Sequence, residues 1–346
     1  VKATVTNNGL ALEYIVPMLK YDEEIVKAAV TNNGLALEFA SYRLRADEEI
    51  VAIAWKQNPD SIRWSRCPTV ELKLLLDDYE NNQIEYLMNG KYQIAGTAID
   101  NVVAYTECQG AVAFEETPDV FAFMGATRLE LSFVVAPDIK SFADLKGQTI
   151  ALDAMATGFA FILYRMLDNA GISRDDVTMV PVGATPDRWD SVKTGKHAGT
   201  LTIEPFTAIA QAAGFRVLES SLQTVDSYQG GSFAARRRWA AENRNALTSF
   251  ISGYLDGLAW TLDPVNRDEG AHVLLRNMPN INPKAIDRIM DKLLSPATGL
   301  TPDATIDEDG FETVLALRSQ YGEREVTDAS KYLDLSFYQQ ALSVRT

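Results

Sequence analysis

The chain has 346 residues, 47% of them hydrophobic, and a formal net charge of -15 at pH 7. This length predicts two or three domains with sizeable cores, and the acidic balance disfavours nucleic acid and anionic membrane surfaces as partners. Two cysteines, Cys67 and Cys108, are too few for a disulfide scaffold or a thiolate metal site, and no apolar run is long enough to span a membrane.

The first 50 residues repeat themselves with a period of 25. VKATVTNNGLALEYIVPMLKYDEEI and VKAAVTNNGLALEFASYRLRADEEI are identical at 17 of 25 positions, and a truncated third copy runs from Val51 to about Arg66. Asp22 and Asp47 are predicted helix N-caps, and Asn-Asn-Gly at 7–9 and 32–34 is predicted to end a helix with a C-cap glycine. LALEFASYRLR is predicted as a second helix. Each block is therefore interpreted as a helical hairpin, one unit of a stacked array.

This segment, residues 1–66, resembles short bacterial and protist helical repeats of unknown function that carry D-x-E-I-V-x-A-A-V-x-x-N-G-x-A-L-x-x-A-S. The resemblance implies no chemistry, and no titratable cluster or glycine loop interrupts the segment. It is interpreted as a packing or docking module.

From Pro68 onward, short apolar runs alternate with amphipathic segments, which predicts strands and helices in alternation. Beyond Tyr228 the chain is predicted to be helical to its end. The predicted strands lie at 70–76, 92–99, 148–153, 177–182 and 199–203, with two more in VFAFMG and LELSFVVAP and another in FRVLES; the helices between them include 158–171, 186–194 and 205–213. The last three numbered strands are expected to form a second, parallel sheet, which gives two small α/β lobes with a cleft between them.

Several strings in residues 68–340 together resemble periplasmic substrate-binding proteins of ABC importers, in the branch that serves alkanesulfonates, nitrate and thiamine pyrimidine precursors. They are SFADLKGQTIALDAMATGFAF, AGISRDDVTMVPVG, the TIEPF string, SFAARRRWAAENRNAL and LDPVNRDEGAHVLL. The resemblance implies a two-lobed type II α/β fold with a helical C-terminal tail, made of lobe 1 (67–136 and 230–346) and lobe 2 (137–229). It also implies a small-molecule ligand, importer membrane subunits as partners, a monomer, and a location that is periplasmic or extracytoplasmic and membrane-associated; the sequence as given carries no signal sequence from which to read the compartment.

The sequence departs from this family where a first strand and helix would precede residue 70. The repeat occupies that place. Either Val1 to Thr6 supplies the missing strand, or lobe 1 is incomplete, or the chain joins two unrelated pieces. Of these we expect Val1 to Thr6 to fill the position in lobe 1 while residues 26–31 stay helical, because an unpaired gap in a sheet leaves backbone groups unsatisfied.

Candidate ligand-binding residues follow the predicted strands. Thr157 and Gly158 begin a helix whose free N–H groups favour an acceptor or anion, or Thr157 serves only as its cap. Thr97, Asp100 and Asn101 end another strand; the Asp100 carboxylate either caps the next helix or accepts a hydrogen bond from an amino group of the ligand.

Four more candidates complete the expected site. Glu204, before Pro205, either binds ligand or caps a helix. Trp189 and Tyr228 are candidates to sandwich a flat ligand, with core packing the alternative for Trp189, and Gln229 lies beside Tyr228 at a contact or a hinge.

Other function classes are less well supported. Pyrimidine-precursor synthases share the implied fold but use a cysteine-rich motif and a histidine to hold iron, whereas this chain has two distant cysteines and only His197 and His272. No catalytic residues, metal site or cofactor are therefore predicted. The remaining alternative is a scaffold in which the repeat is the working part and the lobes bind nothing. The expected ligand is a pyrimidine-like molecule, a sulfonate or an aromatic carboxylate, and the sequence does not decide among them.

Overall fold

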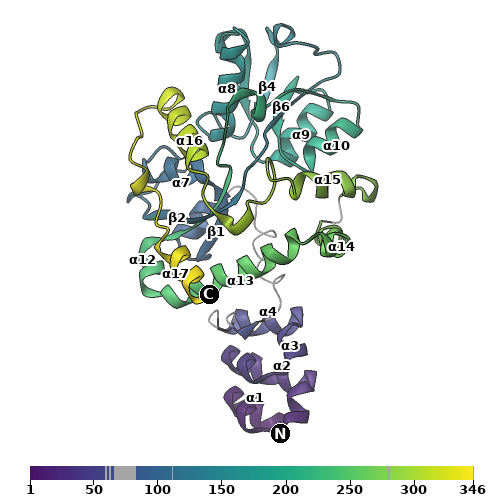
Figure 1. Ribbon diagram of the computed structural model, residues 1–346, viewed down its shortest axis with the longest axis vertical. Coiled ribbons are helices and arrows are strands. Elements are labelled where there is room, and N and C mark those ends of the chain that lie inside the picture. Colours follow the sequence, from purple (N-terminus) through teal and green to yellow (C-terminus); the bar gives the residue numbers. More distant parts are fainter. Residues whose placement is uncertain (59–60, 62–63, 66–82, 111, 279–280, 346) are drawn as a thin grey trace. The chain divides into compact units, whose positions relative to one another are not determined.

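The computed structural model describes residues 1–58, 61, 64–65, 83–110, 112–278 and 281–345 (Figure 1). The strand predicted at 70–76 lies outside them. Within these ranges no helix is long and apolar enough to cross a membrane. The chain divides into two compact units: unit 1 comprises Val1–Tyr79, Asn243–Gly257 and Ala341–Thr346, and unit 2 comprises Glu80–Glu242 and Leu258–Gln340.

The repeat in unit 1 alternates α-helices with short 3-10 helices. Asp22 and Asp47 cap α2 and α4, each accepting a hydrogen bond from the backbone N–H three residues later, at 3.1 and 3.0 Å, as the sequence predicts. Lys2 pairs with Glu24 at 2.8 Å, and the same contact recurs 25 residues later. The elements are α1 (Lys2–Asn7), η1 (Gly9–Tyr14), η2 (Pro17–Tyr21), α2 (Glu23–Asn32), η3 (Gly34–Phe39), α3 (Tyr42–Arg45) and α4 (Glu48–Gln57), and the ion pairs are Lys2–Glu24 and Lys27–Glu49.

The glycines of the repeat have a different role from the one predicted. A Cβ on Gly9 would lie 2.3 Å from the carbonyl oxygen of Ala29, and one on Gly34 would lie 2.2 Å from that of Ala54. Helices α1 and α2 are followed by Asn8 and Asn33, whose backbones are extended, and no left-handed turn follows either helix. Glycine is therefore required because successive repeats approach backbone to backbone, and the predicted C-cap role is wrong.

Two further expectations for the repeat are corrected. Residues Lys2–Asn7 form a helix, so the predicted strand at 1–6 is wrong; the Val5 side chain is fully buried in the hydrophobic core of the repeat. The same sequence therefore takes the same structure in both copies. The predicted second helix is a 3-10 helix and a short α-helix, separated at Ala40, whose backbone is extended.

Unit 2 contains two sheets. Sheet A has the order β1-β8-β2, and β8 is antiparallel to both neighbours. Because β8 lies at its centre, the expectation of an entirely helical chain beyond Tyr228 is wrong; its alanine-rich sequence carries little strand signal, and pairing on both sides determines its conformation. The strands are β1 (Ile94–Ala98), β2 (Val120–Thr127) and β8 (Gly231–Arg236).

Sheet B has the order β5-β4-β6-β3-β7. The three strands predicted as parallel are parallel, but β3 is antiparallel to β6 and β7, so the sheet is mixed. β3 was expected within lobe 1, which was predicted to end at residue 136; its pairing places it in sheet B. The strands are β3 (Ser132–Val135), β4 (Thr149–Leu152), β5 (Thr178–Pro181), β6 (Gly199–Thr202) and β7 (Arg216–Ser220).

Helices cover both sheets, and one continuous hydrophobic core contains residues of both. Helix α16 packs on α7 and on α8 (Figure 1), so it bridges the two sheets. The described helices that follow the repeat in the chain, in either unit, are α6 (Gln83–Met88), α7 (Ile99–Thr106), α8 (Gly158–Asn169), α9 (Thr185–Lys193), α10 (Phe206–Ala212), α11 (Ser221–Thr224), α12 (Arg237–Glu242), α13 (Arg244–Leu262), α14 (Arg267–Asn277), α15 (Ile286–Leu293), α16 (Glu308–Tyr321) and α17 (Ser336–Arg345), with 3-10 helices η5 (Phe142–Leu145), η6 (Arg174–Asp176), η7 (Pro264–Asn266), η8 (Pro283–Ala285), η9 (Pro302–Ala304) and η10 (Ala329–Lys331).

Candidate functional site

The N-termini of α7 and α8 meet between the two sheets. The backbone N–H of Gly158, the first residue of α8, donates a hydrogen bond of 2.7 Å to the Asp100 carboxylate in the first turn of α7. Thr157 caps α8 by accepting from Ala160 at 3.2 Å, and its hydroxyl donates to Asp153 at 2.9 Å. The position at which the sequence predicts an external acceptor is therefore filled by a carboxylate of the chain itself.

Arg318, on α16, holds that carboxylate in a bidentate ion pair. Its Nε and Nη2 atoms donate to the two oxygens of Asp100 at 2.7 and 2.6 Å, and Nη2 also donates to the carbonyl oxygen of Ala156 at 3.1 Å. The two charged side chains are 0% and 2% exposed, and the guanidinium carbon lies 4.9 Å from the Phe161 ring centre. Such a pair is held by hydrogen bonds on both partners, which offset the cost of removing the charges from water.

Tyr228 covers this ion pair. A Cβ added to Gly158 would lie 2.4 Å from the Tyr228 hydroxyl oxygen and 3.0 Å from the Asp100 Cβ, so only glycine fits there. Burial raises the pKa of the Tyr228 phenol far above its usual range, with the Asp100 charge as a second cause. The hydroxyl therefore stays protonated at neutral pH.

The other candidates near this ion pair, Thr97, Asn101 and Gln229, form hydrogen bonds within the chain. Asn101 donates to the Thr97 hydroxyl at 3.0 Å. Gln229 is fully buried; its amide nitrogen donates to the carbonyl oxygen of Gly231 at 2.6 Å, and its amide oxygen accepts from the backbone of Asp307 at 2.8 Å. The Gln229 side chain thus ties the segment before β8 to the start of α16.

Trp189 is not brought together with these residues. Its indole is buried and meets the Phe215 ring edge to face, with ring centres 4.8 Å apart, in a hydrophobic cluster with Val134 and Val192. Tyr228 belongs to the main core instead. The expected aromatic sandwich of these two side chains is therefore absent, because the apolar side of α9 packs Trp189 against sheet B.

Glu204 lines a separate cavity of about 240 Å³. One carboxylate oxygen accepts a hydrogen bond of 3.1 Å from the backbone of Ala208, and burial raises the pKa of Glu204. Lys292 and Glu130, also in the lining, form an ion pair of 2.6 Å. The rest of the wall is mostly apolar; the lining residues are Thr127, Leu129, Glu130, Glu204, Pro205, Leu274, Met278, Ile281, Ile289, Lys292, Leu293, Thr298 and Gly299.

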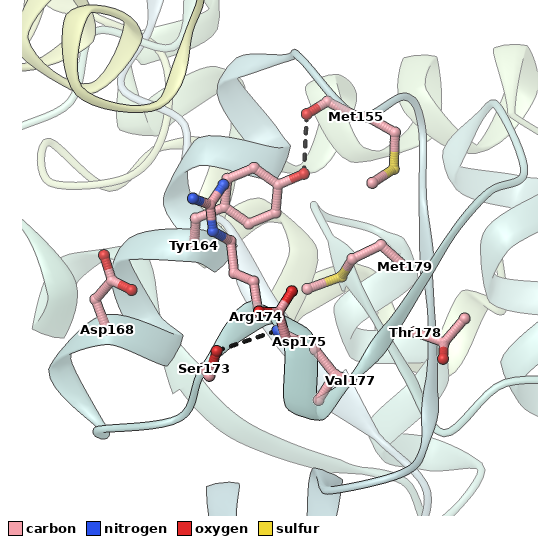
Figure 2. Close-up of a pocket in the computed structure, with 9 residues that line it drawn as sticks. All are labelled: Met155, Tyr164, Asp168, Ser173, Arg174, Asp175, Val177, Thr178 and Met179. Atoms are coloured by element: carbon pink, nitrogen blue, oxygen red, sulfur yellow. Dashed lines mark hydrogen bonds between the residues drawn. The ribbon is translucent and has the colours of Figure 1, made fainter.

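A second hollow, of about 720 Å³, lies at the far end of α8 and along β5 (Figure 2). The Arg174 guanidinium covers the Tyr164 ring, with its carbon 4.9 Å from the ring centre, and the Tyr164 hydroxyl donates to the carbonyl oxygen of Met155 at 2.9 Å. No residue that the sequence singles out lines it. Its wall carries Asp168, Arg174 and Asp175 and has fewer apolar side chains than the wall of the cavity at Glu204.

Neither histidine is in a site suited to metal chemistry. The Nδ1 atom of His197 lies 3.0 Å from the Thr149 hydroxyl, and burial lowers the pKa of the ring, whereas His272 is exposed on α14. Among the residues that the structure describes, no group of three or more His, Cys, Asp or Glu side chains could hold a metal ion.

Arg318 was missed at the sequence level, although its setting carries a signal. It lies seven, four and three residues after Phe311, Val314 and Leu315, which are buried on the same side of α16. A single cation within an apolar helical stripe predicts a buried partner, because an unpaired charge is too costly to bury. The cavity residues Glu130 and Lys292 carried no comparable signal, since they come from distant segments.

An antiparallel sheet and a mixed sheet, joined by crossing segments and covered by helices, define the two-lobed periplasmic-binding-protein fold. Solved structures with this fold include a putative periplasmic sulfonate-binding protein, SsuA, of Methylobacillus flagellatus KT (20% identity, 75% of this chain and 78% of that chain covered, TM-score 0.54). The periplasmic nitrate-binding protein NrtA of Synechocystis PCC 6803 is similar too (13% identity, 76% and 78% covered, TM-score 0.61), as is the desulfurization enzyme DszB (13% identity, 73% and 86% covered, TM-score 0.50).

The chain belongs to the NMT1/THI5-like family, which matches residues 70–266, more than half of its length. Residues 1–45 and 22–66 each match a domain of unknown function, DUF4116, consistent with the repeat. No curated protein matches the sequence.

Proposed function

We propose that this protein is the solute-binding receptor of an ABC importer and that it captures a small organic molecule between its lobes. The cavity at Glu204 is the observation that carries the proposal, because it combines mostly apolar walls with a few polar groups, as small-molecule sites do. The family and the fold support the same class of function. An extracytoplasmic location and docking to importer membrane subunits follow from this proposal.

In this proposal, the predicted residues have two kinds of role. Glu204 contacts the ligand directly. Asp100, Thr157, Gly158 and Tyr228 form the contact that holds the lobes closed, with Thr97 and Asn101 supporting α7 beside them. A ligand that interacts better with the closed state than with the open one shifts the population toward closure, and the closed surface is the one that the importer recognises.

We propose binding without catalysis. Asp100 and Arg318 satisfy each other, and the fully covered Gln229 bonds to backbone, so these groups are not positioned as a nucleophile with its base. The fold alone does not decide the matter, since one structure with the same fold is an enzyme.

The test is recovery of the ligand. Small molecules released by denaturing the purified full chain would be identified by mass spectrometry and then titrated back while the unfolding temperature is recorded. Binding to the folded state must raise that temperature in proportion to the logarithm of ligand concentration. Absence of any released molecule, together with no stabilisation by metabolite extracts, would refute the proposal. Trp189→Phe serves as a control because Trp189 does not line the cavity.

A second candidate function, protein interaction through the repeat, is favoured by one observation. The first repeat exposes several large apolar side chains, among them Tyr14 at 82% and Met18 at 83%, with Val16 and Tyr21 nearby in sequence. Such a patch marks an interaction surface. If the repeat is the working part, Tyr14→Ser with Met18→Ser should abolish association with a protein partner and leave small-molecule stabilisation unchanged.

A further inference from the structure

Resting on the proposed function, we infer that the solute is a small apolar molecule carrying an amine or another N–H donor, and that anions such as sulfonates, carboxylates and nitrate are excluded. Two independent features lead to this inference. One is the occupied N-terminus of α8, and the other is the charge of the cavity at Glu204.

The position that attracts an anion in this fold region is already neutralised. The first N–H of α8 and the Arg318 guanidinium both donate to the Asp100 carboxylate, at 2.6 to 2.7 Å. An external anion would have to displace Asp100, which is 2% exposed and would lose its partners. Because an unpaired buried charge is strongly unfavourable, the chain's own carboxylate excludes a competing one.

The cavity carries the opposite charge from an anion site. Its lining contains two carboxylates, Glu204 and Glu130, and one ammonium, Lys292, which is paired with Glu130 at 2.6 Å. Glu204 forms no ion pair with Lys292, although Lys292 and Arg288 both act on its carboxylate at longer range. Arg288 is exposed on α15 and donates to Gln211.

The lone pairs that remain on the Glu204 carboxylate indicate that the ligand carries a hydrogen-bond donor. One oxygen accepts from the backbone of Ala208, and a carboxylate has further lone pairs available for a donor. Burial raises the pKa of this carboxyl because the charged form has lost contact with water. A hydrogen-bond donor inside the cavity would stabilise that charged form. The apolar wall from α14 and α15 suits a hydrocarbon body, with the amine directed to Glu204; the wall residues are Leu129, Leu274, Met278, Ile281, Ile289 and Leu293.

The experiment compares four probes of one shape: benzylamine, benzyl alcohol, benzoate and benzenesulfonate. Each is titrated into the wild-type full chain by calorimetry and by thermal unfolding. We expect saturable binding of benzylamine, weaker binding of benzyl alcohol and none of the two anions. Glu204→Gln should weaken benzylamine at least tenfold, whereas Glu312→Gln, an exposed carboxylate on α16, should leave binding unchanged.

Three results would overturn the inference: an anion that binds as tightly as benzylamine, benzylamine binding that Glu204→Gln does not weaken, or no binding by any probe. If Glu204→Gln fails to fold, the pH dependence of benzylamine binding to the wild-type chain is measured instead. The affinity must then fall as the pH is lowered through the raised pKa of Glu204. An anionic molecule recovered from the native protein would refute this selectivity and leave the receptor function intact. Failure of both the probes and the metabolite extracts would refute the receptor function as well.

Discussion

The buried pair of Asp100 and Arg318 allows the sharpest test of how the lobes are held together. Asp100→Asn keeps an oxygen that can accept from the Gly158 N–H but removes the charge that compensates the guanidinium. Since the arginine is 0% exposed, it cannot regain water without opening the structure. Removing one partner of such a pair costs about 3 to 5 kcal/mol.

Hydrogen exchange on α8 measures this cost locally. Each 1.4 kcal/mol corresponds to a factor of ten, so the α8 amides should exchange roughly a hundredfold to several thousandfold faster in Asp100→Asn than in the wild type. Adding Arg318→Met should recover a large part of the protection, because the double variant buries no unpaired charge.

The matched control is an exposed pair on α12, Arg238 with Glu242, whose side chains are 86% and 62% exposed. Glu242→Gln should change stability by less than about 1 kcal/mol, as is usual for surface pairs. If Asp100→Asn accelerates exchange no more than this control does, the ion pair does not hold α7, α8 and α16 together and the reasoning is wrong.

Three further outcomes are expected. Gly158→Ala should destabilise unit 2 by about 1 to 3 kcal/mol, because its Cβ would collide with the tyrosine hydroxyl above it; urea unfolding measures this. Gly34→Ala should remove exchange protection from α2 and α4, because its Cβ would meet the Ala54 carbonyl oxygen. Glu204→Gln should raise the unfolding temperature at pH 7 and lose that advantage near pH 4. The raised pKa of Glu204 means that the folded state favours the protonated acid, so wild-type stability falls as the pH rises through the interval between the unfolded and folded pKa values.

Each of these outcomes has its own check. Gly270→Ala on α14 is the control for both glycine variants, since its Cβ would meet only a methionine methyl group at 3.5 Å, and it should be neutral or stabilising. The two close contacts are refuted if Gly158→Ala unfolds like the wild type or if Gly34→Ala leaves hydrogen exchange unchanged. The raised pKa of Glu204 is refuted if the stability gain of Glu204→Gln persists at pH 4.

Local chemistry was sufficient to predict much of the fold. Asp22 and Asp47 were identifiable as caps because a side-chain oxygen satisfies a nearby N–H whatever lies beyond the helix. Strands β4, β5 and β6 were predictable as a parallel set because apolar runs alternated with helices. The start of α8 at Gly158, with Thr157 as its cap, followed from the same local rules.

Long-range packing decided what the sequence left open. The alanine-rich β8 became a central strand, and Lys2–Asn7 became a helix, because the neighbours that surround them favour those conformations. The sequence also placed Asp100 and Gly158 in one candidate site. It did not show that Arg318 pairs with Asp100 there. Arg318 lies 218 positions from Asp100 along the chain, and only the packing of α16 on α7 and α8 brings its charge to the carboxylate. The sequence by itself determined which residues carry charge and which begin helices; the tertiary structure decided which charges are paired, because burial makes pairing obligatory only where distant segments meet.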